Sequence, residues 1–282
     1  MSLHLITVAT HSERYLPVLE AQTRDKNIKL EKLGMGKKYV GHFMKDLETL
    51  EYLKKTRDED IVVFVDGFDT IFIGEPDEVL EKFNRLDCDI LISTENIGYL
   101  SFIHSSVFER VNGNYINTGL YMGKAGKLRN FLEEMYSLDY SLKSNQKTWS
   151  NHLYKLQQEK RLGKIKIDHE SNIFLNNSFT TSNNLRVKGE RVLVSGKRPC
   201  FIQGNGCEDL SYYIRKNGYS HIPIDSADFF VKKVKYNIKA IFSIYNPILS
   251  FYIYLVILLI FLAVFFIQRH KRISSDPYFY LG

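Results

Sequence analysis

Short apolar runs alternate with helix-length segments along most of the chain. Runs rich in Val, Ile and Leu are typical of buried strands, and we expect strands at residues 3–10, 28–33, 61–65, 89–93 and 115–123. The run over 28–33 (IKLEKL) differs from the others because its apolar residues alternate with polar ones, as in a half-buried strand.

Apolar residues recur at helical spacing between these runs, as in residues 42–55. The other expected helices run from Ser12 to about Asp25, from Pro76 onward, over 128–138 and over 149–159, with Ser12 and Pro76 as start signals. Strands that alternate with helices predict an α/β fold with a mostly parallel sheet. In such sheets ligands collect at the carboxyl ends of the strands.

Residues 248–267 read ILSFYIYLVILLIFLAVFFI and carry no charge. A helix of this length rises about 30 Å, the thickness of the hydrocarbon core of a bilayer. Tyr252 and Tyr254 lie near one end, and Arg269 and Lys271 follow the other. We expect a transmembrane helix here, and a buried core helix is the alternative.

This helix divides the chain into a domain over 1–228, a basic juxtamembrane linker over 229–247, the membrane helix over 248–267 and a short basic tail over 268–282. Residues 3–9 are apolar but lack the basic segment of a signal peptide. We therefore expect a single-pass membrane protein, anchored at its C-terminus, with a cytosolic domain. Lysines and arginines flank the span on both sides, so the positive-inside rule does not decide its orientation.

Composition excludes several other classes of protein. With 44% hydrophobic and 25% charged residues, the chain is neither disordered nor collagen-like. A net charge of +6 is no nucleic-acid signature, so no nucleic-acid partner is expected. Cys88, Cys200 and Cys207 make neither a disulfide framework nor a zinc motif, which favours a reducing compartment.

Two acids follow the strand expected at 61–65, in the segment FVDGFDTIF. Asp66 ends the strand, and Asp69 follows across a turn that contains a glycine. Carboxylates this close repel each other unless a positive charge lies between them, and a hard cation such as Mn²⁺ or Mg²⁺ suits oxygen ligands. An ordinary strand-to-turn junction with capping aspartates is the alternative.

Two glycine-containing segments are further candidates for contact with phosphate. GMGKK at 34–38 and FIQGNG at 201–206 could each bring backbone N–H groups to an anion, although plain turns explain both. The chain has no P-loop, GxGxxG, GxSxG or HExxH motif.

These segments occur in a fixed order along the chain: ITVAT, LGMGKKYVG, FVDGFDTIF, YINTGLYMG, IDHESNIF and FIQGNG. The succession resembles the glycosyltransferase domain of the multifunctional procollagen lysyl hydroxylases and the related collagen glycosyltransferases, over residues 3–225. The resemblance implies a GT-A fold, which is Rossmann-like, and a UDP-sugar donor bound through Mn²⁺. The hydroxylase domains of those enzymes have no counterpart here.

The resemblance also implies roles for individual residues. Asp66 and Asp69 match the metal-binding acids of the family, and Asp66 also belongs to the donor site. Thr10 matches a threonine that contacts the nucleotide, and Tyr39 falls where the family has a tryptophan near the nucleotide. Asn205 and Gly206 match the diphosphate side of the HGNG turn of the family.

This chain departs from the family at three places. Gln203 stands where the family has its third metal ligand, a histidine, and a neutral amide oxygen predicts weaker metal binding. The phosphate-binding lysine of the family aligns with Thr49, and Lys45 lies one helical turn earlier on the same face. Paired aspartates on the acceptor side align with Asn145 and Gln146, whereas Asp168 is retained, in a catalytic or a structural role.

The leading hypothesis is a membrane-anchored, metal-dependent enzyme that transfers a hexose from a UDP-sugar to a hydroxyl acceptor on a protein or glycan. Asn145, Gln146 and Asp168 are its candidate catalytic residues. A second hypothesis is a catalytically weakened scaffold subunit that binds a nucleotide-sugar or glycan, because acids are missing at 145 and 146. A third is a structural α/β domain on a membrane protein.

Overall fold

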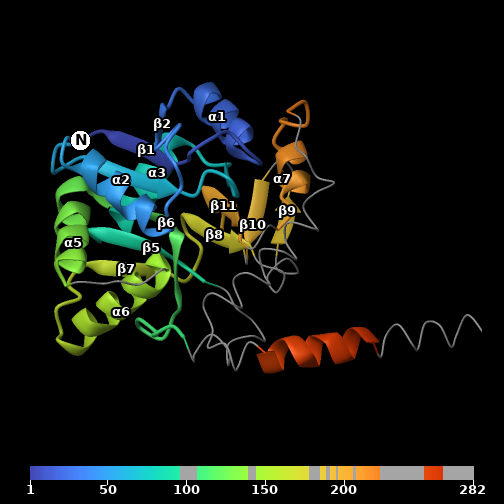
Figure 1. Ribbon diagram of the computed structural model, residues 1–282. Helices are drawn as coiled ribbons and strands as arrows, with labels where there is room; N and C mark the ends of the chain where they lie inside the picture. The colour runs from blue at the N-terminus through green and yellow to red at the C-terminus, as the bar shows by residue number, and fades with distance from the viewer. Residues whose placement is uncertain are drawn as a thin grey trace, which may run out of the picture. The chain divides into compact units, whose positions relative to one another are not determined.

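The computed structural model describes residues 1–95, 107–138, 144–177, 185–188, 191–194, 196–205, 208–222 and 251–262. The chain forms two units, Met1–Lys233 and Val234–Gly282. The first unit contains every labelled helix and strand in Figure 1.

A six-stranded sheet lies at the centre of the first unit, in the order β2-β1-β3-β6-β5-β7 (Figure 1). Its strands are β1 (Leu3–Val8), β2 (Leu30–Leu33), β3 (Ile61–Val65), β5 (Ile90–Thr94), β6 (Ile116–Lys124) and β7 (Ile165–Asp168). Only β6 runs antiparallel to its neighbours β3 and β5. The expected α/β fold with a mostly parallel sheet is thus confirmed, and the carboxyl ends of β1, β3 and β5 lie at the same edge.

A second sheet has three strands in the order β4-β11-β8. These are β4 (Thr70–Phe72), β8 (Phe174–Asn177) and β11 (Phe201–Gly204), and β11 is antiparallel to β4 and parallel to β8. A two-stranded ribbon consists of β9 (Leu185–Lys188) and β10 (Arg191–Val194). Residues 201–204 are therefore a strand that leads into the glycine-asparagine turn, and not only a turn.

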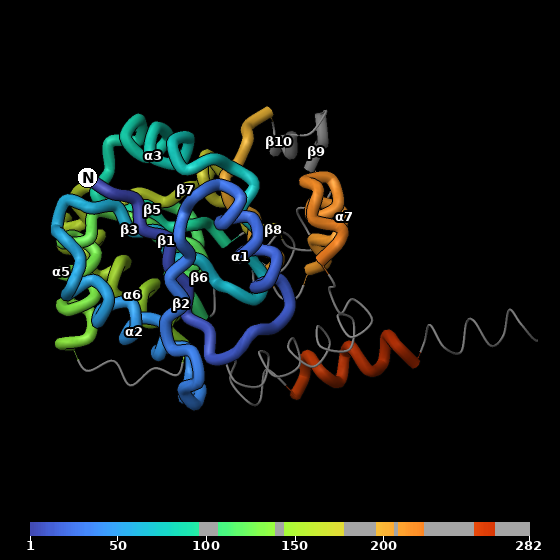
Figure 2. The backbone as a smooth tube through the Cα atoms, turned by 90° about the horizontal axis from the view of Figure 1, so that it is seen from above, coloured from blue at the N-terminus to red at the C-terminus, as the bar shows by residue number. Residues whose placement is uncertain are grey.

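The helices of the first unit are α1 (Leu16–Asp25), α2 (Phe43–Leu53), α3 (Pro76–Arg85), α5 (Ala125–Ser137), α6 (Asn145–Gln158) and α7 (Ser211–Lys216). Figure 2 shows α2, α5 and α6 together on one side of the large sheet and α3 on another. The expected start of α1 at Ser12 is wrong, because the helix begins after Tyr15 with Pro17 in its first turn. The expected start of α6 at 149 is also wrong, because Ser144 caps the helix with its hydroxyl and Asn145 begins it.

Buried side chains fill both faces of the large sheet. Phe64 and Tyr121 stack at 4.7 Å on the face that α2, α5 and α6 cover, and Trp149 packs against Tyr121. On the other face, residues of α1 and α3 pack with Phe72 and Phe201 of the second sheet, whose rings stack at 4.5 Å. This packing brings the second sheet against the first and sets β4 beside the carboxyl end of β3.

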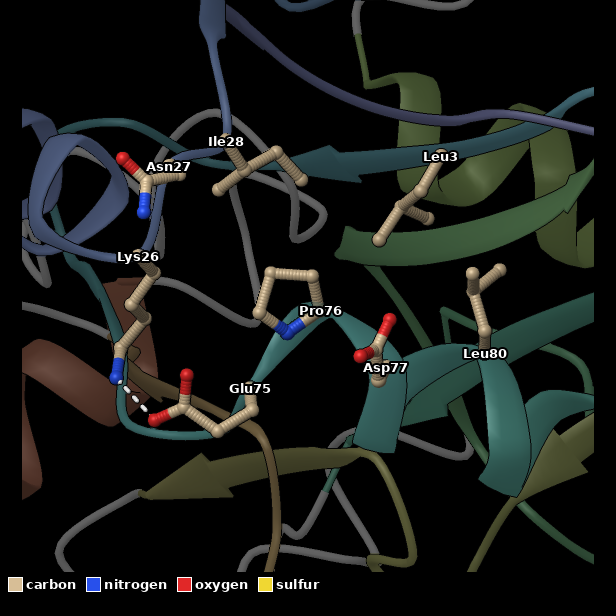
Figure 3. A pocket seen from close by; sticks show the side chains of 8 residues that line it. All are labelled: Leu3, Lys26, Asn27, Ile28, Glu75, Pro76, Asp77 and Leu80. Atoms are coloured by element: carbon tan, nitrogen blue, oxygen red, sulfur yellow. Dashed lines mark hydrogen bonds and ion pairs between the residues drawn. The ribbon is translucent and has the colours of Figure 1, made fainter.

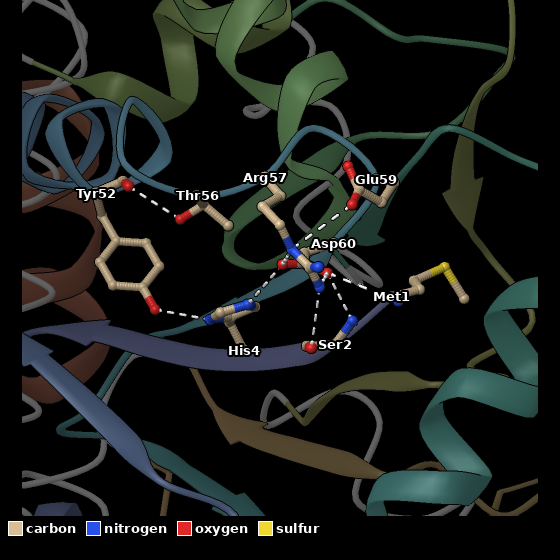
Figure 4. A network of polar contacts seen from close by, with 8 residues as sticks. All are labelled: Met1, Ser2, His4, Tyr52, Thr56, Arg57, Glu59 and Asp60. Carbon is tan, nitrogen blue, oxygen red and sulfur yellow. Dashed lines mark hydrogen bonds and ion pairs between the residues drawn. The ribbon is translucent and has the colours of Figure 1, made fainter.

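A polar network lies at the amino end of β1, far along the strands from the acids of FVDGFDTIF. Figure 4 shows Asp60 at its centre, where it accepts hydrogen bonds from Arg57, the backbone N–H of Ser2 and His4. The hydrogen bonds from Arg57 are the main reason why the pKa of Asp60 is lowered, although burial opposes this. The network ties the start of β1 to the start of β3.

The second unit has a helix over residues 251–262 whose large apolar side chains are almost all exposed. Within the described residues, no helix has both the length and the apolar character that a membrane span requires. The flanking parts of the expected span, residues 248–250 and 263–267, lie outside the described residues, as do the expected linker and tail.

Candidate active site

The two acids of FVDGFDTIF lie at the carboxyl end of β3, as the sequence predicts. The backbone N–H of Asp66 donates to Gly119 O of the neighbouring β6 at 2.8 Å, which continues the pairing of the two strands by one residue. Gly67 allows the chain to turn here, because a Cβ at this position would lie 2.7 Å from Thr7 Oγ1. Asp69 then precedes β4, so one turn holds both carboxylates.

Strand β11 brings Gln203 to the same turn from the other end of the domain. Gln203 pairs with Thr70 in the β4–β11 ladder, and Gly204 N donates to Asp69 O at 2.7 Å. The Gln203 amide nitrogen lies 3.3 Å from Asp66 Oδ2 and 3.2 and 3.3 Å from the two Asp69 carboxylate oxygens. The three predicted metal ligands therefore converge.

Lys45 of α2 places a positive charge at this cluster, and the positive charge of Arg14 also acts on Asp69. Its Nζ lies 2.5 Å from Asp66 Oδ1, and both side chains are 18% exposed. Burial opposes the charged form of Lys45, but the attraction of Asp66 more than offsets this and the net effect raises the pKa of Lys45. Burial and the negative charge of Asp66 raise the pKa of Asp69.

The chemistry of the Gln203 side chain fits a cation at this cluster. Its Oε1 is buried and has no hydrogen-bond partner among the described residues, whereas its nitrogen faces both acids. A half-turn of the amide about its last torsion would exchange the two atoms and put three oxygen-bearing side chains around one point. Neighbouring oxygens around Mg²⁺ are about 3 Å apart, close to the separations found here.

A metal ion at Asp66 and Asp69 would need Gln203 as its third protein ligand. Among the described residues, no group of three or more His, Cys, Asp or Glu side chains gathers to hold a metal ion. The donor set is two carboxylates and an amide oxygen, which suits a hard divalent cation.

Glu95 is a buried acid of the site that the sequence did not reveal. It directly follows β5, as Asp66 follows β3, and it is 8% exposed. Asn117 of β6 and Asn205 of the β11 turn donate to its two oxygens, the latter at 2.6 Å, and Gln146 is a third donor. Burial raises the pKa of Glu95 to about 7, although the three amides oppose the shift.

The neighbours Asn145 and Gln146 have different partners. Gln146 reaches Glu95, so it belongs to the site. Asn145 is buried and donates to Asp46 Oδ1 of α2 at 3.4 Å. The structure thus brings one of the two candidate catalytic residues at the start of α6 into the site and turns the other toward α2.

Asp168, the third candidate catalytic residue, is the last residue of β7, just before the turn that leads to β8. Its two oxygens accept hydrogen bonds from the backbone N–H groups of Asn172, Ile173 and Phe174 at 2.8–2.9 Å. These bonds hold the turn, and the described contacts do not join Asp168 to the acids at 66 and 69.

The structure places Tyr39 beside the cluster and Thr10 beside the GMGKK segment. Thr10 follows β1, and its carbonyl accepts from Gly36 N at 2.9 Å, beside the GMGKK segment. Tyr39 is 51% exposed and feels the charges of Lys45 and Asp66, so its ring lies at the mouth of the site. Gly206 lies outside the described residues.

Thr49, the position that aligns with the phosphate-binding lysine of the family, is buried and bonds Tyr121 Oη at 3.3 Å. Lys45 lies one turn earlier and is the cation that reaches the site.

A separate hollow of about 550 Å³ lies at the amino end of β1. Figure 3 shows Leu3, Pro76 and Leu80 around it, with Lys26 paired to Glu75 at 2.6 Å on its rim. None of the predicted site residues lines this hollow.

Comparisons with known proteins give a consistent result. The family model of the PLOD GT domain matches residues 1–219. The chain is 25% identical over 222 residues to "Multifunctional procollagen lysine hydroxylase and glycosyltransferase LH3" of Homo sapiens, an alignment that covers 72% of this chain and 30% of that protein. It is 26% identical over 224 residues to "Procollagen-lysine,2-oxoglutarate 5-dioxygenase 1" of Gallus gallus, an alignment that covers 73% of this chain and 30% of that protein.

The chain therefore spans about 30% of the length of these relatives. A solved glycosyltransferase involved in the glycosylation of the major capsid of PBCV-1 superposes with a TM-score of 0.48 at 11% identity, over 79% of this chain and 100% of that chain.

The contact between Gly119 and Gln203 generates a first prediction. A Cβ at 119 would lie 2.3 Å from Gln203 Nε2 and 2.5 Å from its Oε1, so Gly119→Ala displaces the amide from the acids. We expect this variant to weaken Mn²⁺ binding about tenfold, measured by isothermal titration calorimetry.

The double variant Gly119→Ala/Gln203→Ala is the matched control. Removal of the Gln203 side chain relieves the crowding, so the double variant should unfold at a higher temperature than Gly119→Ala alone. If Gly119→Ala binds Mn²⁺ like the wild type, the amide has no part in the metal site.

Proposed function

Because the chain belongs to the PLOD GT domain family, the glycosyltransferase domain of procollagen lysyl hydroxylases, we propose that it transfers a hexose from a UDP-sugar to a hydroxyl acceptor in a metal-dependent reaction. One observation carries this proposal: Asp66, Asp69 and Gln203 converge at the carboxyl end of β3, beside Lys45. An anionic donor needs this combination of oxygen ligands for a cation and a separate positive charge for its phosphates.

The donor side of the site is formed by Asp66, Asp69 and Gln203, which would hold Mn²⁺ or Mg²⁺. When bound, the cation would neutralise the diphosphate and make UDP a better leaving group. Lys45 would contribute a second positive charge to the same phosphates, since its Nζ already lies at the cluster. Asn205 lies at the turn that would face the diphosphate.

The nucleoside of the donor would lie between the ends of β1 and α2. The exposed ring of Tyr39 offers a face on which a uracil can stack. Thr10, beside the backbone of Gly36, would contact the sugar or base of the nucleoside.

The acceptor hydroxyl would approach from the side of Glu95. Its carboxylate is buried at the edge of the site and is oriented by Asn117, Asn205 and Gln146. A carboxylate with a pKa of about 7 can accept a proton from an attacking hydroxyl near neutral pH. This side would accept a hydroxyl on a protein such as collagen, or on a glycan.

A non-catalytic scaffold that binds nucleotide-sugar or glycan is the second candidate. The neutral amide of Gln203 at the third ligand position, and the amides of Asn145 and Gln146 where the family has acids, favour this alternative. The enzyme and the scaffold differ in whether a bound donor is turned over.

Hydrolysis of UDP-hexoses by the full chain with Mn²⁺ tests the enzyme directly. We expect turnover that EDTA abolishes, and a loss of about 10²-fold in Asp69→Asn because one charged ligand is removed. Gln203→His should bind Mn²⁺ more tightly than the wild type, since an imidazole nitrogen is a stronger ligand than an amide oxygen.

The exposed acid Asp87 provides the control, and Asp87→Asn should keep wild-type turnover. Turnover in Asp69→Asn at the wild-type level would remove the metal site from the proposal. UDP binding with no turnover on any UDP-hexose would favour the scaffold.

The pKa of Glu95 generates a prediction of pH dependence. Since burial raises this pKa to about 7, the carboxylate becomes ionised as the pH rises from 6 to 8, and transfer should become faster over this range. Glu95→Gln should be slower and should lose this rise, measured as initial rates at saturating donor. An unchanged pH profile in Glu95→Gln would exclude Glu95 as the titrating group.

We also propose that residues 248–267 anchor the chain in a membrane. The run has no charge, and the helix over 251–262 exposes Phe251, Leu255, Leu259 and Phe261, which need an apolar environment. A basic linker at Lys232 and Lys233 would lie near anionic lipid headgroups.

Alkaline carbonate extraction of cell membranes tests the anchor. The wild-type chain should remain in the membrane pellet, and Leu255→Arg/Leu259→Arg should move to the supernatant, because each charge in the bilayer centre is costly. Ser274→Arg/Ser275→Arg, outside the span, should pellet like the wild type. Release of the wild-type chain by carbonate would contradict the proposal.

A further inference from the structure

Asp46 of α2 is a buried acid outside the metal cluster. It is 0% exposed and accepts hydrogen bonds from two other helices. Tyr136 Oη of α5 lies 2.7 Å from its Oδ2, Trp149 Nε1 of α6 lies 3.1 Å from the same oxygen, and Asn145 Nδ2 of α6 lies 3.4 Å from Oδ1. One carboxyl group thus joins α2, α5 and α6.

The partners of Asp46 suit its ionised form. A carboxylate only accepts hydrogen bonds, and the hydroxyl, indole and amide groups around it can all donate. Burial raises the pKa of Asp46 to about 6, while these hydrogen bonds and the charge of Lys45 oppose the shift. The titratable groups that face it are Lys45 on the same helix, Tyr136 of α5 and Tyr121 of β6.

Asp46 is adjacent in sequence to Lys45, a residue of the site. Its partner on α6, Asn145, is likewise adjacent to Gln146. Lys45 reaches Asp66, whereas Asp46 reaches Asn145. Asn145 in turn precedes Gln146, which reaches Glu95. The contact between Asp46 and Asn145 therefore fixes the first turn of α6 at the place where its next residue enters the site.

We propose that Asp46 is a positioning residue, whose buried carboxylate holds the first turn of α6 against α2 and so keeps Gln146 on Glu95. This inference rests on the proposed function, because it assigns Asp46 to the acceptor side of the same site. The proposed donor ligands Asp66, Asp69 and Gln203 are not held by the first turn of α6. Substitution of Asp46 should therefore change turnover more than nucleotide affinity.

A role limited to helix packing predicts a different order of importance for the hydrogen bonds to Asp46. If Asp46 only stabilised the fold, loss of the Tyr136 hydrogen bond would matter at least as much as loss of the longer Asn145 bond. If Asp46 positions Gln146, the Asn145 bond matters for turnover and the Tyr136 bond does not. Tyr136→Phe and Asn145→Ala therefore form a matched pair on one carboxylate.

The experiment measures three quantities on Asp46→Asn, Asn145→Ala and Tyr136→Phe. These are turnover of a UDP-hexose with Mn²⁺, the Kd for UDP with Mn²⁺, and amide hydrogen exchange over residues 144–150. We expect Asp46→Asn and Asn145→Ala to lose at least tenfold in turnover, to keep the Kd within threefold, and to exchange faster over 144–150. Tyr136→Phe should keep turnover within threefold.

The exchanged pair Asp46→Asn/Asn145→Asp provides a rescue. The amide introduced at position 46 would donate to the new carboxylate at position 145 and still accept from Tyr136 and Trp149 through its carbonyl oxygen. Turnover should therefore exceed that of Asp46→Asn. Trp149 is the single tryptophan of the chain, so its fluorescence reports whether each variant retains the packed contact.

Two outcomes would overturn the proposal. One is wild-type exchange over 144–150 together with wild-type turnover in Asn145→Ala. The other is a loss of turnover in Tyr136→Phe as large as that in Asn145→Ala. If the wild-type chain turns over no donor, the proposed function fails on its own, and the exchange measurement still decides whether the Asn145 bond, rather than the Tyr136 bond, holds the first turn of α6.

Discussion

The repulsion between two carboxylates at the end of one buried strand governs the polar groups around them. Asp66 and Asp69 are held in a single turn by backbone pairing to β6 and β11, so they cannot move apart to relieve it. Lys45 of α2 places a positive charge beside Asp66, and Gln203 of β11 places an amide beside both acids. Gly119 leaves room for that amide. A divalent cation would meet the same need with higher charge and would leave Lys45 for the phosphates of a donor.

Polar contacts continue from this cluster around the mouth of the sheet. Gln203 and Asn205 lie two residues apart on β11 and the turn that follows it, so the first contacts the acids and the second contacts Glu95. Adjacent residues also have different partners on α2 and α6. Lys45 contacts Asp66 whereas Asp46 contacts Asn145, and Gln146, next to Asn145, contacts Glu95. Short stretches of backbone therefore link the acids at 66 and 69 to the buried acids at 46 and 95.

Much of this arrangement could be predicted from the sequence, because its signals are local. The all-apolar run of β3 leads directly into Asp66, and the resemblance to the family implies that Gln203 lies near it. Glu95 could not be found in this way, since its importance depends on amides from β6, α6 and β11 that only the folded register brings together. The separation of Asn145 from Gln146 was equally hidden, because it depends on a carboxyl group of α2 that lies 99 residues earlier.

We propose that the acids at 66 and 69 and the amide oxygen of Gln203 surround a divalent cation that carries a nucleotide-sugar. A crystal grown with UDP and Mn²⁺ tests it most directly through the anomalous scattering of manganese. We expect one strong peak within about 2.3 Å of an oxygen from each of the three side chains, with the Gln203 amide turned and the Lys45 ammonium moved toward phosphate. A bound UDP with no manganese peak there, and with the Gln203 nitrogen still facing both acids, would contradict it.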